Sequence, residues 1–145
     1  MIVNGLIVIF TFFFMEFVAW FAHKYIMHGF LWFLHKDHHQ VDHTKKFQKN
    51  DYFFLIFAIP SILCFVYGAE NYSYLFFIGI GILLYGLAYF IIHEIIIHRR
   101  LPPPSKTKNK YIIAIRKAHK IHHKNRNKEH CINFGMLIVP RKYFK

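Results

Sequence analysis

Ten of the twelve histidines in this chain follow one spacing pattern that occurs twice. Each copy has two histidines separated by four residues, then a histidine, two other residues and two adjacent histidines. Imidazole is a common ligand for iron, zinc, copper and nickel, so a duplicated set of this kind predicts a metal site. The ten residues are His23, His28, His35, His38, His39, His93, His98, His119, His122 and His123.

Helical spacing lets some of these side chains act together. Each residue of an α-helix advances about 100°, so His35, His38 and His39 lie within about 100° of one another and can all point at one place. His23 and His28 are about 140° apart on an α-helix and do not share a face. Such a pair either flanks two metals or sits where a helix ends, and the spacing leaves both alternatives open.

The number of imidazoles limits the kind of metal. Tetrahedral zinc takes four ligands, and a catalytic zinc usually takes three protein ligands and a water. Ten rings exceed any single zinc site. Two octahedral metals would receive about five rings each and keep one open position for a ligand derived from oxygen. The count therefore favours a di-iron centre.

Long apolar runs indicate a membrane protein. Hydrophobic residues make up 55% of the 145 residues and aromatic residues 20%, which is high for a soluble domain of this size. As a helix, about 20 apolar residues cross a hydrocarbon core of roughly 30 Å, which predicts spans at residues 2–22, 52–69 and 72–92. The first run lacks the basic start and the cleavage site of a signal peptide, so we expect it to remain as a span.

The fold class follows from these runs. We expect an all-α integral membrane protein with about three to four transmembrane helices, a helical histidine-rich cap, and residues 1–145 in a single domain. Pro102, Pro103 and Pro104 interrupt any helix after His98, so a new helix that presents the last histidines is expected to begin near Asn109. Residues 132–139 are apolar but too short to span, and they are expected to pack against the site or lie in the membrane interface.

The basic residues predict the orientation in the membrane. All 19 lysines and arginines lie in residues 24–49 and 99–145, and none lies in the N-terminal run or in the connection at residues 70–71. The positive-inside rule places both basic segments, and both histidine sets with them, on the cytoplasmic side of the membrane. In a bacterium this would be the inner membrane. Basic cytoplasmic loops also account for the net charge of +12, so we do not expect nucleic-acid binding.

Carboxylates near the histidines are candidates for orienting them. A metal-bound histidine usually donates its second ring nitrogen to a carboxylate or a carbonyl. Glu16 stands out because it lies inside a span, about two turns before His23 and on the same face, and a charge within lipid usually has a function. The four candidates are Glu16, Asp37, Asp51 and Glu94.

Several motifs together resemble the bacterial beta-carotene hydroxylases, a branch of the fatty acid hydroxylase and sterol desaturase superfamily. The resemblance runs nearly end to end and keeps the motif order. Besides the two His-x2-His-His motifs it includes the segments at residues 23–29, 50–51, 98–100 and 134–137. Residues 129–133 depart from the more acidic, glycine-containing stretch typical of the family, which bears on the rim of the site and on substrate preference.

The resemblance implies a specific activity. It implies a non-haem di-iron monooxygenase that uses O2 to hydroxylate carbons 3 and 3′ of beta-ionone rings, converting beta-carotene through cryptoxanthin to zeaxanthin, with the ten histidines as iron ligands. The chain has no dinucleotide-binding fingerprint, P-loop or haem-attachment motif, so electrons are expected from a separate protein. The family implies that this external donor is of the ferredoxin type.

Other functions fit parts of the pattern. A related hydroxylase for fatty acyl chains or sterols, or a carotenoid ketolase, would keep the metal site and change the pocket. A membrane metal transporter would place its ligands along a path through the spans, whereas these histidines gather where the spans end. A noncatalytic scaffold would not need a duplicated motif. The pattern carries no information on the oligomeric state.

Overall fold

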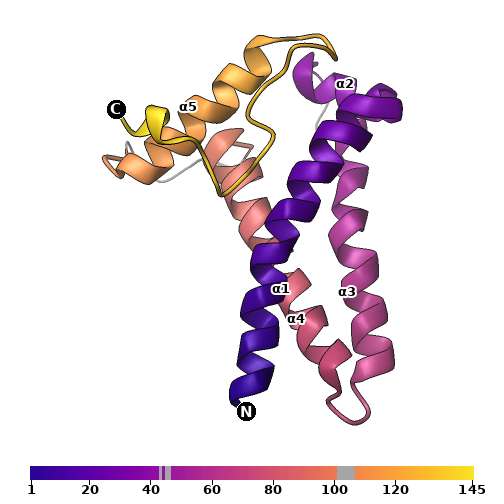
Figure 1. Cartoon of the computed structure of the whole chain (residues 1–145). Helices are drawn as coiled ribbons and strands as arrows, with labels where there is room; N and C mark the ends of the chain where they lie inside the picture. The colour runs from indigo at the N-terminus through magenta and orange to yellow at the C-terminus, as the bar shows by residue number, and fades with distance from the viewer. Residues whose placement is uncertain (43, 45–46, 101–106) are drawn as a thin grey trace.

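Three long helices form the stem of the molecule (Figure 1). The computed structural model describes residues 1–42, 44, 47–100 and 107–145, and within them three helices are long and apolar enough to cross a membrane, as predicted. The first joins α1 (Ile2–Phe21) to the π-helix η1 (Ala22–Phe30). The second joins the 3-10 helix η2 (Lys49–Phe54) to α3 (Leu55–Gly68), and the third joins α4 (Tyr74–Phe90) to the π-helix η3 (Ile91–Ile97).

Shorter helices form a cap on one end of the stem. They are α2 (Trp32–His39), α5 (Lys110–Lys124) and the 3-10 helix η4 (Arg141–Phe144). The helix predicted to begin near Asn109 is confirmed, because the side-chain oxygen of Asn109 accepts the backbone N–H groups of Tyr111 at 2.9 Å and Ile112 at 3.2 Å. The predicted break at residues 102–104 lies outside the described residues.

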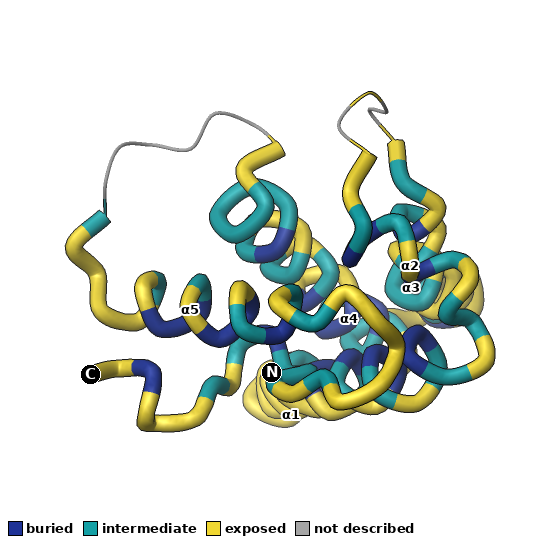
Figure 2. The backbone as a smooth tube through the Cα atoms, turned by 90° about the horizontal axis from the view of Figure 1, so that it is seen from above, coloured by how far each residue is buried: buried dark blue, intermediate teal, exposed yellow. Residues whose placement is uncertain are grey.

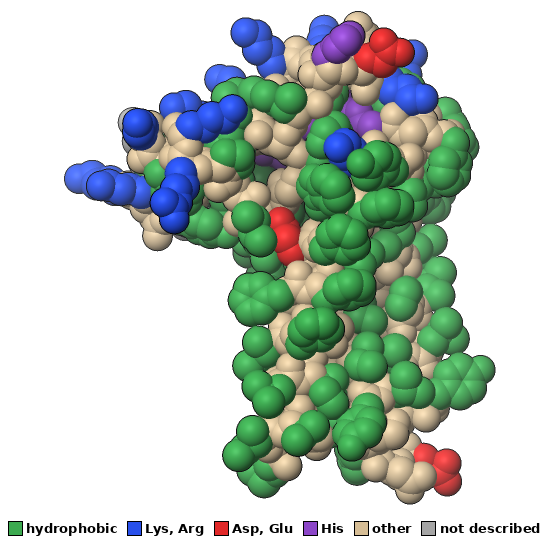
Figure 3. Space-filling model, viewed as in Figure 1, with side chains coloured by type: hydrophobic (Ala, Val, Ile, Leu, Met, Phe, Trp, Pro, Cys, Tyr) green, Lys and Arg blue, Asp and Glu red, His purple; other side chains and the backbone are tan. Residues whose placement is uncertain are grey.

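The outer surface of the stem is apolar. Phe10, Phe13 and Val66 are each more than 60% exposed, and at most 22% of the most apolar stretch of any of the three helices is buried within the protein. Exposing so much apolar area to water would cost about 25 cal/mol for each Å². Lipid is the environment in which this surface is stable, and hydrophobic side chains cover the stem in Figure 3.

The stem helices pack through small residues on α4. This helix contacts both α1 and α3, and its Tyr85 is fully buried with Met15, Ala19 and Ile82. A Cβ at Gly81 would lie 2.6 Å from the Cβ of Thr11, which is closer than atoms can approach. Glycine therefore sets the distance between α4 and α1, as small residues commonly do between helices in membranes.

The two ends of the stem differ in charge. The N-terminus and the turn between α3 and α4 lie at the end away from the cap (Figure 1). The Lys and Arg side chains gather over the cap (Figure 3). Both histidine sets therefore share the basic end of the molecule, as the charge pattern predicts. That this end faces the cytoplasm stays a prediction.

The apolar segment at residues 132–139 returns from α5 to the stem, beside which it runs in Figure 2. The Oε1 atom of Glu16 accepts the backbone N–H groups of Met136, Leu137 and Ile138 at 2.9, 2.9 and 3.0 Å. The other carboxylate oxygen accepts the hydroxyl of Tyr85 at 2.6 Å. The prediction that this segment packs against the site is confirmed by two of its carbonyl groups, which contact histidines directly.

Candidate metal centre

The ten histidines of the duplicated pattern converge where the cap meets the stem. One group, which we call group A, has ring nitrogens within 4.8 Å of one another and consists of His23, His28, His35, His39 and His122. A second cluster meets the same criterion and consists of His38, His98, His119 and His123. His93 adjoins this cluster, because its Nε2 lies 3.2 Å from Nε2 of His38. We call these five residues group B.

The central histidine of each His-x2-His-His motif crosses to the other group. His35 and His39 belong to group A with the other ligands of the first half, but His38 joins group B. His122 of the second half likewise joins group A. Helical spacing predicts that His35, His38 and His39 can point at one place. The structure divides them instead, because α2 lies between the two groups and sends His38 to one side.

The two His-x4-His pairs lie on π-helices. This decides whether the two histidines of a pair flank two metals or serve the same one. A π-helix bonds each residue to the fifth one along, and the N–H of His98 donates to the carbonyl of His93 at 2.9 Å in this way. The fifth residue therefore returns close to the same face. Ring centroids are 4.5 Å apart for His93 and His98 and 5.2 Å apart for His23 and His28. Each pair belongs to one group.

The histidines of group A are held almost entirely by backbone carbonyl groups. Their Nδ1 atoms donate to oxygens on other segments, which fixes the tautomer and orients each ring. The acceptor oxygens are Phe134 O for His23 (3.0 Å), Lys128 O for His28 (3.1 Å), Asn50 Oδ1 for His35 (2.6 Å), Asn125 O for His39 (2.9 Å) and Ile132 O for His122 (2.9 Å).

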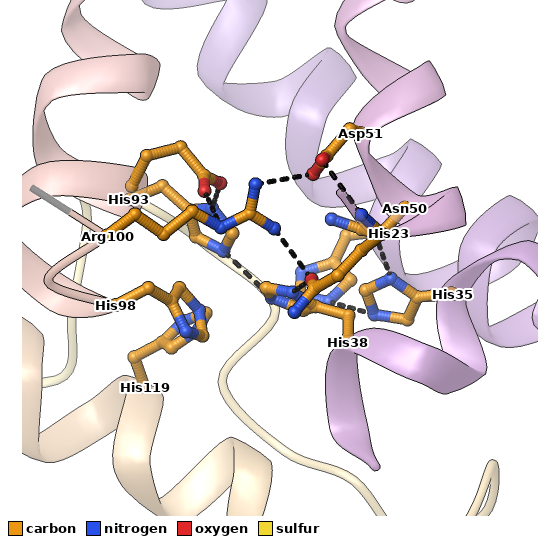
Figure 4. Close-up of polar contacts among 11 residues, drawn as sticks. His23, His35, His38, Asn50, Asp51, His93, His98, Arg100 and His119 are labelled. Carbon is orange, nitrogen blue, oxygen red and sulfur yellow. Dashed lines mark hydrogen bonds and ion pairs between the residues drawn. The ribbon is translucent and has the colours of Figure 1, made fainter. Parts of the chain in front are cut away.

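Two histidines of group B are held by side chains. Nδ1 of His38 donates to Oε1 of Gln48 at 2.9 Å, and Nδ1 of His93 donates to the Glu94 carboxylate. Arg100 contacts both acceptors, with 2.7 Å to Gln48 Oε1 and 2.8 Å to the second carboxylate oxygen of Glu94 (Figure 4). His38 and His93 are thus oriented by amide and charged side chains, whereas the histidines of group A are oriented mainly by the main chain.

The facing Nε2 atoms indicate a cation in each group. When the Nδ1 of a neutral imidazole donates, its Nε2 carries a lone pair and no proton. Nε2 of His28 lies 3.3 Å from Nε2 of His122, and the same atoms of His38 and His93 are 3.2 Å apart. Lone pairs facing each other repel unless a cation lies between them. Two ligands at right angles, each about 2.1 Å from an ion, are about 3.0 Å apart, so these distances fit a metal.

Buried nitrogens without a partner support the same conclusion. Nε2 of His39 and Nε2 of His123 make no hydrogen bond within the described part of the chain, although they are shielded from solvent. Burying such an atom without a partner costs about 1–3 kcal/mol. A metal ion would satisfy one of these atoms in each group.

Burial keeps the histidines of the cap neutral. Burial, with neighbouring imidazoles as further causes, lowers the pKa of His39 to about 4 and that of His98 to about 3. Burial also lowers the pKa of His38, His119 and His122 below the usual value. Only the neutral ring offers a lone pair to a metal, so these rings are ready to bind one at neutral pH.

Of the four carboxylates predicted to orient histidines, one contacts a histidine directly and the others act through neighbouring segments. Glu94 accepts directly from His93. Asp37 instead accepts the backbone N–H groups of Lys49 and Asn50, and Asp51 accepts the N–H of Gln48 at 3.0 Å. These two residues fix the start of η2, which carries Asn50.

Glu16 also affects a histidine indirectly, through a segment of the main chain. Its carboxylate holds the segment whose Phe134 carbonyl accepts from His23, and the hydrogen bonds found for it in the described residues lead to that segment and to Tyr85.

An apolar pocket of about 810 Å³ lies beside the histidines, between the cap end of α1, η2 with α3, and α4. Phe53, Phe57 and Leu87 are among its apolar lining, and its polar lining includes Asn50 and Glu94. Gln48, Asn50 and Arg100 were not singled out by their own spacing. Their positions inside or beside the motifs at residues 50–51 and 98–100 were the only available signals.

Comparison with known proteins gives a consistent result. The family model for fatty acid hydroxylases matches residues 8–140. Beta-carotene hydroxylase from Pantoea ananas is 40% identical over 94% of this chain and 78% of its own length, and that from Paracoccus sp. (strain PC1) is 37% identical over 93% and 83%. The chloroplastic beta-carotene 3-hydroxylase 2 of Arabidopsis thaliana is 31% identical over 88% of this chain and 43% of its own length. No solved structure matches the chain.

Proposed function

The chain belongs to the fatty acid hydroxylase family, and from this premise we propose that it hydroxylates carbon 3 of the beta-ionone rings of beta-carotene, giving cryptoxanthin and then zeaxanthin. The observation that carries the proposal is the similarity to bacterial beta-carotene hydroxylases at 36–40% identity over most of the chain. An apolar pocket that opens beside two histidine groups supports it.

We propose that groups A and B each bind one iron ion, with the ten histidines as ligands. Bound iron would supply the oxidising power to insert one atom of O2 into a C–H bond, while the other atom leaves as water with two electrons and two protons from a donor. The chain contributes neutral imidazoles whose Nε2 atoms are aimed inward by their Nδ1 partners. Five rings for each ion leave one octahedral position free.

The pocket is suited to an apolar hydrocarbon. Its lining is largely aliphatic and aromatic, and it extends from the cap end of the spans, at Asn50, down into the stem as far as Phe65 and Leu83. One end of a long apolar substrate can therefore lie beside the histidines while the rest stays in the bilayer. Near the histidines its apolar lining includes Met27, Phe47 and Phe53.

The electron supply and the orientation are part of the same proposal. We propose a separate donor of the ferredoxin type that reaches the basic cap from the cytoplasm, with the protein in the bacterial inner membrane. The basic surface would favour an acidic partner, since complementary charges speed encounter. Residues 1–145 act as a single domain, because groups A and B each contain ligands from both halves.

The direct test is to produce the chain in a bacterial host that accumulates beta-carotene, and to separate the pigments. We expect cryptoxanthin and zeaxanthin. Oxygenated fatty acids or sterols, or ketone products, would instead indicate a related hydroxylase or a ketolase. A transporter is disfavoured because the buried histidines of groups A and B cluster at the cap end of the stem. Metal uptake without any oxidised product would nevertheless support it.

Ligand roles are tested with His38→Ala, which should abolish product while the protein still accumulates in the membrane. His130→Asn is the matched control, because His130 is exposed, lies outside both groups, and has a φ of 62° that asparagine tolerates. The control should retain full activity. Full activity in His38→Ala would exclude His38 as an essential ligand.

A further inference from the structure

The polar end of the pocket is made from the residues that orient the histidines. Gln48, Asn50 and Glu94 all line the pocket, and each accepts a hydrogen bond from Nδ1 of a histidine in group A or B. The remaining polar residues of this lining include Asp51 and Arg100. A molecule that fills the pocket therefore ends against the same side chains that hold the rings.

Arg100 connects these side chains to one another. Its guanidinium uses all three nitrogens, with 2.7 Å from Nη2 to Gln48 Oε1, 2.8 Å from Nε to Glu94 Oε2 and 2.8 Å from Nη1 to Asp51 Oδ1. A planar guanidinium with several fixed donors holds its partners in one geometry, which a flexible lysine cannot do.

These contacts close a ring through group B (Figure 4). Arg100 contacts Gln48, whose same oxygen accepts from His38. Nε2 of His38 faces Nε2 of His93 at 3.2 Å, and His93 leads through Glu94 back to Arg100. His38 comes from the first half of the chain and His93 from the second, so the ring joins the two halves at the pocket. Within the described residues, none of the acceptors found for group A contacts Arg100.

We propose that Arg100 is a positioning residue that forms the polar end wall of the pocket and fixes the His38–His93 pair, so that the end of a bound substrate is held at one distance from group B. This role presupposes the proposed hydroxylase activity. The carboxylates of Asp51 and Glu94 balance its charge, so the wall presents few free donors to the substrate. An apolar ring can rest against it without leaving an unsatisfied hydrogen bond.

The test compares Arg100→Gln and Arg100→Lys with Arg99→Gln. Arg99→Gln is the control, because it removes the same charge at the neighbouring, exposed residue. Three quantities are measured: iron bound per protein with its Mössbauer spectrum, the affinity of the iron-loaded protein for beta-carotene without O2, and the position of oxygen in the product.

In Arg100→Gln we expect about tenfold weaker binding of beta-carotene, an altered Mössbauer signal for one of the two irons, and part of the oxygen at ring carbons other than carbon 3. Arg100→Lys should have the same defects in weaker form, and Arg99→Gln should match the wild type. Unchanged affinity, spectrum and product position in Arg100→Gln would overturn the proposal. A protein too unstable to bind iron in both Arg100 variants would also overturn it, because that result indicates a purely structural role.

Failure of the proposed function has a different signature. In that case the wild type would produce no hydroxylated carotenoid, and the iron-loaded protein would not bind beta-carotene. The Mössbauer response of group B to Arg100→Gln would still report on the ring of contacts alone.

Discussion

The stem and the cap place opposite kinds of residue in their interiors. The stem buries few side chains, and those are mainly apolar, such as Met15 and Tyr85, while many of its phenylalanines face outward to lipid. The interior of the cap next to the stem is formed largely by imidazoles, and His35, His38 and His122 are among the least exposed large side chains of the described chain. Lipid can stabilise the stem without any ligand. A small apolar cluster of Ala114, Ala118 and Tyr143 joins α5 to η4. Where the cap meets the stem, however, facing lone pairs take the place of apolar packing, so this part of the cap needs a cation to be stable.

Metal removal should separate the two regions most clearly. After chelation we expect hydrogen exchange to become at least about tenfold faster in residues 107–130, because the repulsion between facing Nε2 atoms is no longer compensated. Exchange in α4 should stay unchanged, since lipid covers it. If residues 107–130 exchanged as slowly without metal as with it, the cap would not depend on a cation in the way that distinguishes it from the stem.

Acidification should weaken the metal-free cap next. The usual pKa of histidine is about 6.5, whereas burial holds that of His39 at about 4 in the folded protein. Between these values the unfolded cap binds more protons than the folded cap, so the free energy of unfolding falls as the pH falls. Denaturation followed by fluorescence of Trp32, which packs on His39, checks this in a Trp20→Phe background. A denaturation midpoint that does not move between pH 7 and about pH 5 would refute it.

Glu16→Gln tests the contact between the regions. The carboxylate accepts three backbone N–H groups and the Tyr85 hydroxyl, and hydrogen bonds to a charged group contribute about 1.5–3 kcal/mol, so we expect a loss of about 2–3 kcal/mol. Iron content should also fall, since the held segment orients His23 and His122. Tyr85→Phe is the control and removes only one of the bonds. Unchanged iron by elemental analysis would show that the segment does not need Glu16.

The smallest effect is expected within the stem. Gly81→Ala places a Cβ 2.6 Å from Thr11 and should cost about 1–2 kcal/mol, with the iron spectrum unchanged. Gly5→Ala is the matched control, because a Cβ there meets nothing within 4 Å and alanine favours the helix by about 1 kcal/mol. Unfolding in detergent measures both. Loss of iron in Gly81→Ala would indicate that the stem positions the cap more tightly than the contacts imply.

Features that depend on local sequence could be predicted. The spans follow from apolar length, and the start of α5 follows from the capping residue Asn109. The convergence of ten imidazoles at one end follows from their place after the spans. Each of these properties is set by residues close together in the chain.

Features that depend on how helices cross could not be predicted. The transfer of His38 and His122 between groups depends on where α2 and α5 lie relative to each other, which spacing along one helix does not contain. The π-helical winding of η1 and η3 was equally hidden, because α-helical geometry was the reference for His23 and His28. The backbone acceptors of group A, such as the carbonyl of Phe134, could not be predicted because every residue has a carbonyl group. Only the fold decides which of them lies beside a histidine.

The presence of His122 in group A has a consequence for how the protein is made. Four of the five histidines of this group precede residue 40, but the fifth is synthesised only with α5, after all three spans. During translation the nascent protein can thread all three spans into the bilayer while both ion positions are still unfinished. Under the proposed function, both iron sites are therefore complete only after membrane insertion, and a cell short of iron would accumulate inserted but inactive chains.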